Sequence, residues 1–313
     1  MVEISLQIEG QAGLTWPRWK QMVAATEGLG FAGLFRSDHF TGGAPPDQDS
    51  LEAVISLAYA ADHTKAIHFG TLVSPLSFRH PALLARQAAG LDDLSGGRMV
   101  LGLGAGWQER EHTLFGFPLG DISTRMARFE EGLQVVTQLL RSGEPVTYRG
   151  QFFQLEGAEL LPRPTRPGGP TILIGGNGPR RTLPLVARYA DIWNALFLTP
   201  AQFSELGGVL DEHLRQEGRE GRVKRTMMIG LQFGRTMPEL EQYLYRRRPG
   251  GDARQELERL LERGNVLVGT PDMVVEQIKR YGEAGVEELM VQWFDLEDLE
   301  GLRGFAESIL PRL

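Results

Sequence analysis

The chain has 313 residues, of which 42% are hydrophobic and 23% charged, an ordinary composition for a soluble globular protein. Its formal charge of -7 disfavours a nucleic-acid partner, and the absence of cysteine excludes disulfides, thiolate nucleophiles and cysteine-ligated metals. No apolar run reaches the roughly 18 residues of a membrane span, so we expect a cytoplasmic protein with no membrane partner.

Strand-like and helix-like segments alternate along the chain without a linker between them. The apolar periodicity predicts strands at 2–8, 33–37, 67–73, 99–103, 171–174, 191–195, 227–233 and 286–293. It predicts helices at 16–29, 50–62, 81–94, 125–140, from about 199, and from 271 to about 284, with a closing helix after the last strand. About eight strand–helix units predict an α/β fold, a closed (β/α)8 TIM barrel that forms a single domain over residues 1–313.

Two of the expected helices carry an apolar stripe at helical spacing. The helix at 81–94 is expected to bury four side chains, Leu84, Ala88, Leu91 and Leu94. The helix at 125–140 is expected to bury another four, Phe129, Leu133, Val136 and Leu140. Thr270 followed by Pro271 predicts the start of a late helix, because threonine favours the N-cap position and proline the first helical position.

Two segments interrupt the alternation. Residues 145–157 combine two short extended runs around Arg149-Gly150-Gln151, which predicts an inserted hairpin. Residues 237–265 are long, charged and rich in glutamate and arginine, which predicts a helical excursion near the barrel mouth. Because active sites in such barrels lie at the carboxyl ends of the strands, the residues that follow each strand are the candidates for function.

The segment Thr171 to Asn194 predicts an anion site. Its strand stops at Gly175-Gly176-Asn177-Gly178 and a helical pattern follows, so several backbone N–H groups are left unpaired at a helix start. Glycines admit a phosphate close to the backbone, and Arg180 with Arg181 can add charge-assisted hydrogen bonds. The alternative is an ordinary glycine-rich turn with exposed arginines.

Other strand ends carry groups suited to chemistry. Asp38 and His39 follow the second strand, where a histidine can exchange a proton near neutral pH or serve a purely structural hydrogen bond. Leu72-Val73 ends the third strand either in an apolar bulge suited to the face of a flat ring or simply as a buried strand followed by a loop that contains proline. Gly104 to Trp107 follows the fourth strand with small residues that admit a ring, and Trp107 can wall a pocket. The histidines lack the spacing of metal ligands, so no metal is expected.

Taken together, these segments resemble the bacterial luciferase-like superfamily, and in particular its branch that uses the deazaflavin coenzyme F420. The resemblance spans nearly the whole chain and rests on motifs in the family's order. They are Ser37-Asp38-His39-Phe40, Gly70-Thr71-Leu72-Val73, Phe78-Arg79-His80-Pro81, Leu94-Ser95-Gly96-Gly97-Arg98, Leu101 to Trp107, Gly175-Gly176-Asn177-Gly178 and Gly269-Thr270-Pro271.

The resemblance implies roles for four of these motifs. His39 would be the proton donor or acceptor beside the hydride-transfer centre, with Asp38 nearby on the coenzyme ring. Leu72-Val73 would carry the family's non-prolyl cis peptide behind the ring. The ring and substrate pocket would be lined by Gly104, Ala105, Gly106 and Trp107. The coenzyme phosphate would be held by Gly175, Gly176, Asn177 and Gly178, with Arg180 behind.

The resemblance also has a departure. Sugar-phosphate dehydrogenases of this branch carry a tryptophan shortly after the histidine and a glutamate after the Gly-x-Gly. This chain has Phe40-Thr41-Gly42-Gly43 and Gly106-Trp107 there, so glucose 6-phosphate is not the expected substrate and Trp107 cannot be a general acid.

The resulting prediction is an oxidoreductase that transfers hydride between reduced F420 and a small carbonyl or activated alkene. The alternatives are an FMN-dependent monooxygenase that activates dioxygen and a non-catalytic flavin-binding barrel. The family also predicts a homodimer. The substrate is expected to depend on loop 41–49 and on the excursion that begins at Met237.

Overall fold

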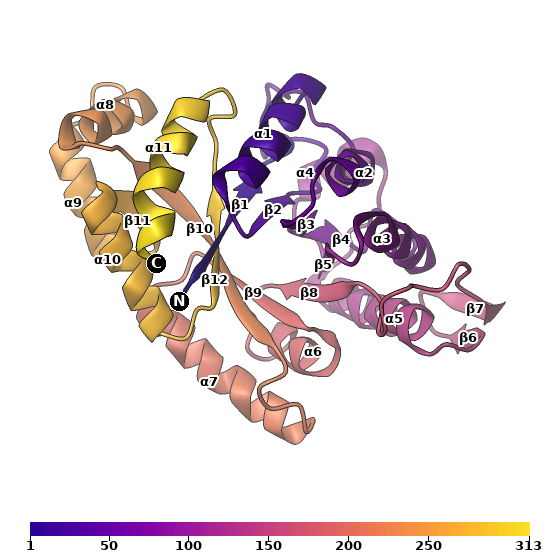
Figure 1. Ribbon diagram of the computed structural model, residues 1–313. Helices are drawn as coiled ribbons and strands as arrows, with labels where there is room; N and C mark the ends of the chain where they lie inside the picture. Colours follow the sequence, from indigo (N-terminus) through magenta and orange to yellow (C-terminus); the bar gives the residue numbers. More distant parts are fainter.

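A computed structural model describes all residues from 1 to 313, and its centre is a barrel of parallel strands (Figure 1). The barrel strands are β1 Glu3–Ile8, β2 Gly33–Arg36, β3 His68–Thr71, β5 Met99–Gly104, β8 Thr171–Gly175, β9 Ile192–Leu196, β10 Lys224–Phe233 and β12 Glu288–Gln292. Each strand pairs in parallel with the next, and β12 pairs with β1, so that the sheet closes without a free edge. The predicted eight-stranded barrel is confirmed.

Helices surround the barrel and connect its strands (Figure 1). They are α1 Trp16–Leu29, α2 Ala53–His63, α3 Pro81–Ser95, α5 Ile122–Arg141, α6 Thr182–Tyr189, α7 Pro200–Gln216, α10 Pro271–Glu283 and α11 Leu299–Ile309, which a 3-10 turn, η1 Leu310–Arg312, extends. Local signals fix several of their starts. Thr199 forms a capping box with Gln202, whereas Thr270 occupies the predicted N-cap position without a side-chain capping bond. No helix combines the length and the apolar character needed to cross a membrane.

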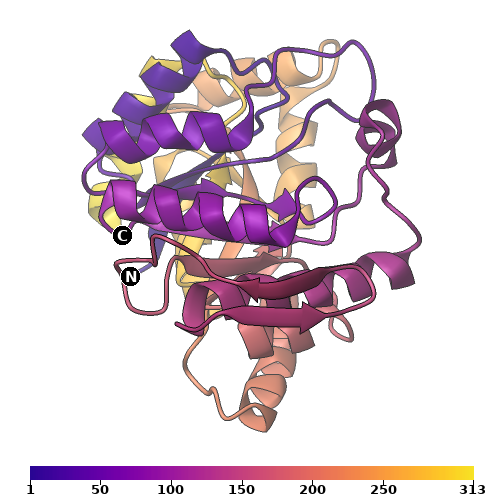
Figure 2. The same ribbon diagram turned by 90° about the vertical axis from the view of Figure 1, so that its right-hand side faces the viewer.

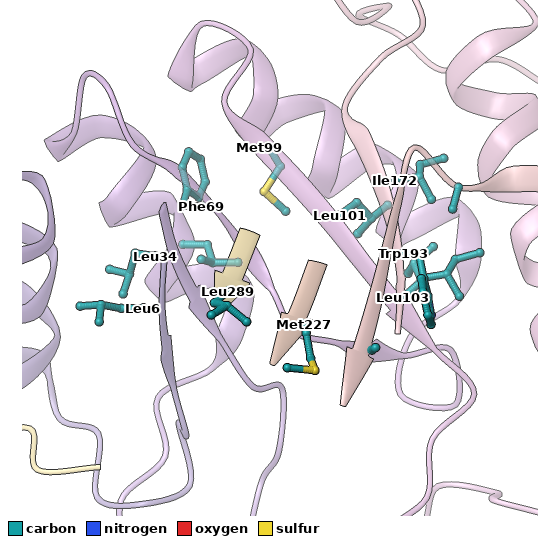
Figure 3. Close-up of a cluster of buried hydrophobic side chains, with 14 of the residues drawn as sticks. Leu6, Leu34, Phe69, Met99, Leu101, Leu103, Ile172, Trp193, Met227 and Leu289 are labelled. Carbon is teal, nitrogen blue, oxygen red and sulfur yellow. The ribbon is translucent and has the colours of Figure 1, made fainter. Parts of the chain in front are cut away.

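The apolar core has two layers because successive strand residues point to opposite faces. Leu34 belongs to the large cluster between barrel and helices, whereas its neighbour Phe35 belongs to a small cluster of seven buried residues drawn mainly from the barrel strands. Figure 3 shows strand residues of the large cluster, including Leu6, Phe69 and Trp193. Both layers hold the carboxyl ends of the strands in fixed positions, and the site is built on those ends.

Both predicted insertions are present. The hairpin consists of β6 Val146–Arg149 and β7 Gln154–Ala158, which pair antiparallel and lie along α5 (Figure 2). The excursion consists of α8 Met237–Arg247 and α9 Ala253–Arg263. The sequence did not predict the strand that follows, β11 Val266–Gly269, which pairs with the end of β10 beyond the point where β9 stops. It also missed the two-residue β4 Ser74–Pro75 and the short helix α4 Glu109–Phe115.

One predicted core residue is exposed. Leu84, Ala88 and Leu91 are buried on α3 as expected, but Leu94 is 53% exposed. At about 100° per residue, position 94 lies roughly 80° away from the direction of Leu84, and position 95 returns to it. Ser95 is accordingly the buried residue at the end of this face, so the apolar stripe ends one turn earlier than predicted.

Glycines set how closely β3 and β5 approach each other. A Cβ atom on Gly102 would lie 2.0 Å from the carbonyl oxygen of Thr71, which is far inside contact distance. We predict that Gly102→Ala lowers the free energy of unfolding by roughly 2–3 kcal/mol, because the two strands must move apart. Urea unfolding followed by circular dichroism measures the change.

Gly90→Ala is the matched control, because Gly90 lies within α3 and no atom is within 4 Å of the Cβ position. There the same substitution should be neutral or stabilising by about 0.5–1 kcal/mol, owing to the helix propensity of alanine. Equal stability of Gly102→Ala and the native protein would contradict the close packing of β3 on β5.

Candidate active site

A cavity of about 700 Å3 opens at the carboxyl ends of the barrel strands. All eight strands or the residues that follow them contribute to its wall. The lining residues are Glu9, Gln11, Ser37, His39, Gly43, Leu72, Val73, Pro75, Gly104, Ala105, Gly106, Trp107, Gln108, Glu111, Gly175, Gly176, Asn194, Leu196, Phe197, Met228, Gln292 and Phe294. Loop 41–49 reaches this wall through Gly43, whereas the excursion 237–265 does not line it and approaches it through Arg247, which lies over the ring of Phe294. That the excursion influences the substrate stays a prediction.

His39 lies at the cavity wall in a hydrogen bond with a buried glutamate. Its Nδ1 is 2.7 Å from Glu111 Oε1, and the other carboxylate oxygen accepts the backbone N–H of Phe40 at 3.0 Å. Glu111 belongs to α4 and is only 1% exposed, so its carboxylate is fixed by these two contacts. The structure therefore gives His39 an anionic partner that the sequence did not indicate.

The surroundings of His39 act on its pKa in opposite directions. Burial disfavours the charged imidazolium and would lower the pKa. The hydrogen bond and the charge of Glu111, together with the more distant charges of Glu9 and Asp38, outweigh burial and raise the pKa above the ordinary value of 6.5. Near neutral pH the imidazole is thus a group that can hold a proton and release it.

Asp38, the other predicted catalytic residue, does not line the cavity. Its carboxylate is buried and accepts hydrogen bonds from Ser74 at 2.6 Å and from both terminal nitrogens of Arg79. Arg79 also pairs with Glu52. These contacts place Asp38 behind the wall, where it orients the segment that carries His39, and its contact with a coenzyme ring stays a prediction.

Val73 forms a flat part of the wall. The Leu72–Val73 peptide is cis, as the resemblance implied, and both residues line the cavity. Three glycines face the Val73 side chain, and a Cβ atom on any of them would meet it, at 3.2 Å for Gly102, 2.6 Å for Gly104 and 3.1 Å for Gly175. Glycine at these positions leaves room for Val73 and keeps the wall free of further side chains.

The segment after β5 lies where it was predicted. Gly104, Ala105, Gly106 and Trp107 all line the cavity. Trp107 is 68% exposed, and its ring meets that of His39 edge to face at a centroid distance of 5.6 Å. The indole therefore forms the rim of the cavity beside His39.

Only half of the predicted phosphate loop lies at the cavity wall. Gly175 and Gly176 line the cavity, whereas Asn177 and Gly178 lie beyond it. The amide of Asn177 donates to the backbone oxygen of Leu196 at 2.8 Å and accepts from its N–H at 2.9 Å. This side chain consequently ties the end of β8 to the end of β9, and its contact with a coenzyme phosphate stays a prediction.

Backbone donors at this loop are nevertheless free. The N–H groups of Asn177, Gly178, Arg180 and Arg181 donate to no protein acceptor, and α6 begins directly afterwards at Thr182. Arg180 lies outside the cavity, beside Arg181 in a shallow depression between α5 and α6. The loop thus retains the donors of an anion site, while the position of Arg180 fits a contact from the outer side.

Asn194 offers an acceptor at the cavity wall. Six buried side-chain polar atoms lack a protein partner, and Asn194 Oδ1 is the one whose residue lines the cavity. Thr226 Oγ1 donates to the backbone oxygen of Trp193 and accepts from Asn194 Nδ2 at 2.9 Å, which fixes the orientation of the amide. A buried carbonyl oxygen without a donor is costly, so this atom is suited to a ligand N–H or O–H.

Sequence reasoning missed Glu9, Glu111, Asn194 and Gln292. Glu9 directly follows the first strand, and Asn194 interrupts the apolar strand Ile192–Leu196, so both positions carried a signal. Glu111 had none, because its contact with His39 joins residues 72 positions apart. No three histidine, aspartate or glutamate side chains gather as a metal centre, and His112 is held by Ser77 and by the backbone of Gln108.

Fold and site together define a class of protein: a parallel barrel whose mouth combines a wall of glycines around Val73 with a carboxylate-supported histidine. The luciferase-like monooxygenase family model matches residues 2–288. The chain belongs to the luciferase-like monooxygenase family, and the predicted family is confirmed.

Several known proteins are similar over most of their length. The F420-dependent glucose-6-phosphate dehydrogenase of Amycolatopsis mediterranei (strain U-32) is 27% identical, over 94% of this chain and 93% of that protein. The 4-hydroxyprotoasukamycin monooxygenase of Streptomyces nodosus subsp. asukaensis is 28% identical over 82% and 76%. A solved F420-dependent secondary alcohol dehydrogenase, in complex with an F420–acetone adduct, has the same fold with a TM-score of 0.83 at 21% identity, covering 99% of this chain and 98% of that one.

The His39–Glu111 contact leads to a prediction about pH. Because the pKa of His39 is raised in the folded protein, the contact stabilises the fold fully below the unfolded value of 6.5. That contribution is lost as the pH rises through the folded pKa. Glu111→Gln keeps the shape of the side chain but removes its charge, so it should lower the pKa of His39 and weaken this pH dependence.

Nitrogen NMR of the histidine rings over a pH series measures the pKa, with urea unfolding at pH 6 and pH 8 as the second readout. The exposed His63 serves as an internal control, because Glu111 does not contact it. An unchanged His39 titration in Glu111→Gln would show that Glu111 does not control this imidazole.

Proposed function

We propose that the protein is an oxidoreductase that transfers a hydride between reduced coenzyme F420 and a small organic substrate of the carbonyl or activated-alkene type. The observation that carries the proposal is that the His39–Glu111 pair lies in the same cavity as Val73 and the glycines beside it. The F420-dependent enzymes among its relatives support the choice of coenzyme.

The residues present fit a deazaflavin ring. Gly104 and Gly175 leave a surface beside Val73 that a planar ring can approach, since no Cβ atom stands in the way. Asn194 Oδ1 is a buried acceptor suited to a ring N–H or to a hydroxyl of the attached chain. The free N–H groups of Asn177, Gly178, Arg180 and Arg181 would hold the phosphate.

The coenzyme, when bound, supplies the hydride. The protein supplies the proton: Glu111 accepts a hydrogen bond from Nδ1 of His39, so Nε2 is the nitrogen that exchanges its proton with the substrate. In reduction of a carbonyl, the protonated imidazole gives the Nε2 proton to the substrate oxygen while carbon receives the hydride. In the reverse direction neutral His39 accepts the hydroxyl proton. Glu111 favours the charged imidazolium in both directions.

An FMN-dependent monooxygenase is the second candidate, and the relative from Streptomyces nodosus favours it because that protein is named a monooxygenase. A non-catalytic flavin-binding barrel is the third, although storage of a coenzyme would gain nothing from a buried carboxylate on His39. Association into a homodimer and a cytoplasmic location stay predictions.

Titration of the apoprotein with oxidised F420 and, separately, with FMN tests the choice of coenzyme through ligand fluorescence. We expect saturable F420 binding that is about tenfold or more tighter than FMN binding. His39→Ala should retain this affinity but slow the oxidation of reduced F420 by cyclohexanone about 10²–10⁴-fold, the usual contribution of a proton-transfer group.

Preference for FMN would instead indicate the monooxygenase, and oxygen consumption would then be the assay. Binding of neither coenzyme would refute both enzyme proposals. Unchanged turnover in His39→Ala would remove His39 as the proton carrier.

The phosphate position is tested by two substitutions of Asn177. Asn177→Ala and Asn177→Asp both lose the donor to Leu196, but aspartate keeps the acceptor and adds a negative charge beside the free N–H groups. We expect Asn177→Asp to weaken F420 binding about tenfold more than Asn177→Ala, because only the charge repels a phosphate. Equal affinities of the two variants would place the phosphate elsewhere.

A further inference from the structure

The cavity wall contains carboxylates but no lysine or arginine side chain. Its ionisable lining residues are Glu9, His39 and Glu111, and no lysine or arginine is among them. Glu111 and His39 form a pair, so that the imidazole offsets the charge of that glutamate when it is protonated. Glu9 has no ion pair, which leaves one uncompensated carboxylate in the wall.

Glutamine side chains hold the Glu9 carboxylate in place. Oε1 accepts from Gln292 Nε2 at 2.8 Å and from Gln7 Nε2 at 3.2 Å, and Oε2 accepts from Gln11 Nε2 at 2.8 Å. Gln11 is fixed in turn by Ser37, whose hydroxyl donates to its amide oxygen at 2.7 Å. Neutral donors orient and solvate a carboxylate without forming an ion pair with it. Buried Arg36 also acts on Glu9 electrostatically, but only from a distance, because its guanidinium donates to neutral oxygen atoms behind the wall.

The guanidinium groups near the mouth are engaged elsewhere. Arg79 pairs with Asp38 and Glu52, and Arg110 pairs with Asp47. Arg247 of α8 stacks over the ring of Phe294 at 5.1 Å but does not line the cavity itself. Arg125 donates to the backbone oxygen of Gly106 but does not line the cavity, so no lysine or arginine side chain stands in the wall itself.

From this charge distribution we infer that the substrate is uncharged or cationic and carries a hydroxyl or amino group that donates to Glu9. The rest of the wall is largely apolar and includes Leu196, Phe197 and Met228. It can therefore accommodate a hydrocarbon frame. Phosphorylated and carboxylated substrates are disfavoured, because they would bring a second negative charge into a low-dielectric cavity.

This inference rests on the proposed function, since it describes the substrate of that same site. It separates the chain from its relative in Amycolatopsis mediterranei, which is named for glucose 6-phosphate, a sugar that carries a phosphate dianion. It also gives Glu9 the role of a specificity-determining residue at the end of β1.

Four rigid ketones that differ in one substituent test the inference: cyclohexanone, 4-hydroxycyclohexanone, 4-aminocyclohexanone and 4-oxocyclohexanecarboxylate. Their binding is measured at pH 7 by ligand-observed NMR, on the apoprotein and on the F420-loaded protein. We expect the ammonium and hydroxyl probes to bind at least about tenfold more tightly than the carboxylate probe. Comparable or tighter binding of the carboxylate, or binding of no probe, would overturn the inference.

Glu9→Gln removes the charge at nearly constant shape and should reduce the ammonium-to-carboxylate affinity ratio about tenfold. Glu109→Gln is the control, because Glu109 is an exposed residue of α4 outside this cavity and its substitution should leave the ratio unchanged. An unchanged ratio in Glu9→Gln would remove Glu9 as the selector. If Glu9→Gln does not fold, the order of the affinities of the four probes for the native protein still tests the inference.

Different results would refute the proposed function and the inference about the substrate. Failure of F420 to bind would refute the proposed function alone, because the probe affinities are also read on the apoprotein. F420 binding combined with a preference for the carboxylate probe would refute only the inference about the substrate.

Discussion

The close approach of β3, β5 and β8 around Val73 is the constraint on which the site depends. Gly102, Gly104 and Gly175 face the valine side chain at distances that no Cβ atom could occupy without displacing it. Because these positions are glycine, the strands can converge around the Val73 side chain. The segment after β5 then passes directly into Trp107 and α4, and α4 brings Glu111 to His39. The Val73 wall and the His39–Glu111 pair are therefore parts of one arrangement.

Three carboxylates near the barrel mouth have different partners and hence different roles. Asp38 is bound by an arginine and a serine behind the wall, which makes it a positioning group. Glu111 is bound by a histidine, whose pKa it raises. Glu9 is bound only by neutral amides and keeps its charge facing the cavity. Environment, rather than residue type, assigns these roles.

The sequence predicted most of the fold because the alternation of apolar strands and helices is a local pattern. It also predicted His39, Val73 and the residues Gly104 to Trp107 at the cavity wall, since strand ends in a parallel barrel must meet. Side-chain partners were not predictable in the same way. Whether Asp38 faces the cavity or Arg79 depends on the packing of segments 41 residues apart.

The length of the buried apolar face of a helix also depends on tertiary packing. Leu94 continues the composition of its helix but not its buried face, and the neighbours of α3 decide where that face ends. Arg180 shows the same limit, because its sequence position beside the glycine loop did not reveal that it lies between α5 and α6. Residues fixed by distant contacts require the folded structure.

The most direct test of the account is a crystal structure of the protein with oxidised F420. We expect the deazaflavin ring to lie with one face on Val73 and with its reacting carbon beside His39 Nε2. An N–H or hydroxyl group of the coenzyme should donate to Asn194 Oδ1. A ring bound away from Val73, or a ring that leaves His39 facing solvent, would contradict the assignment of this cavity as the site of hydride transfer.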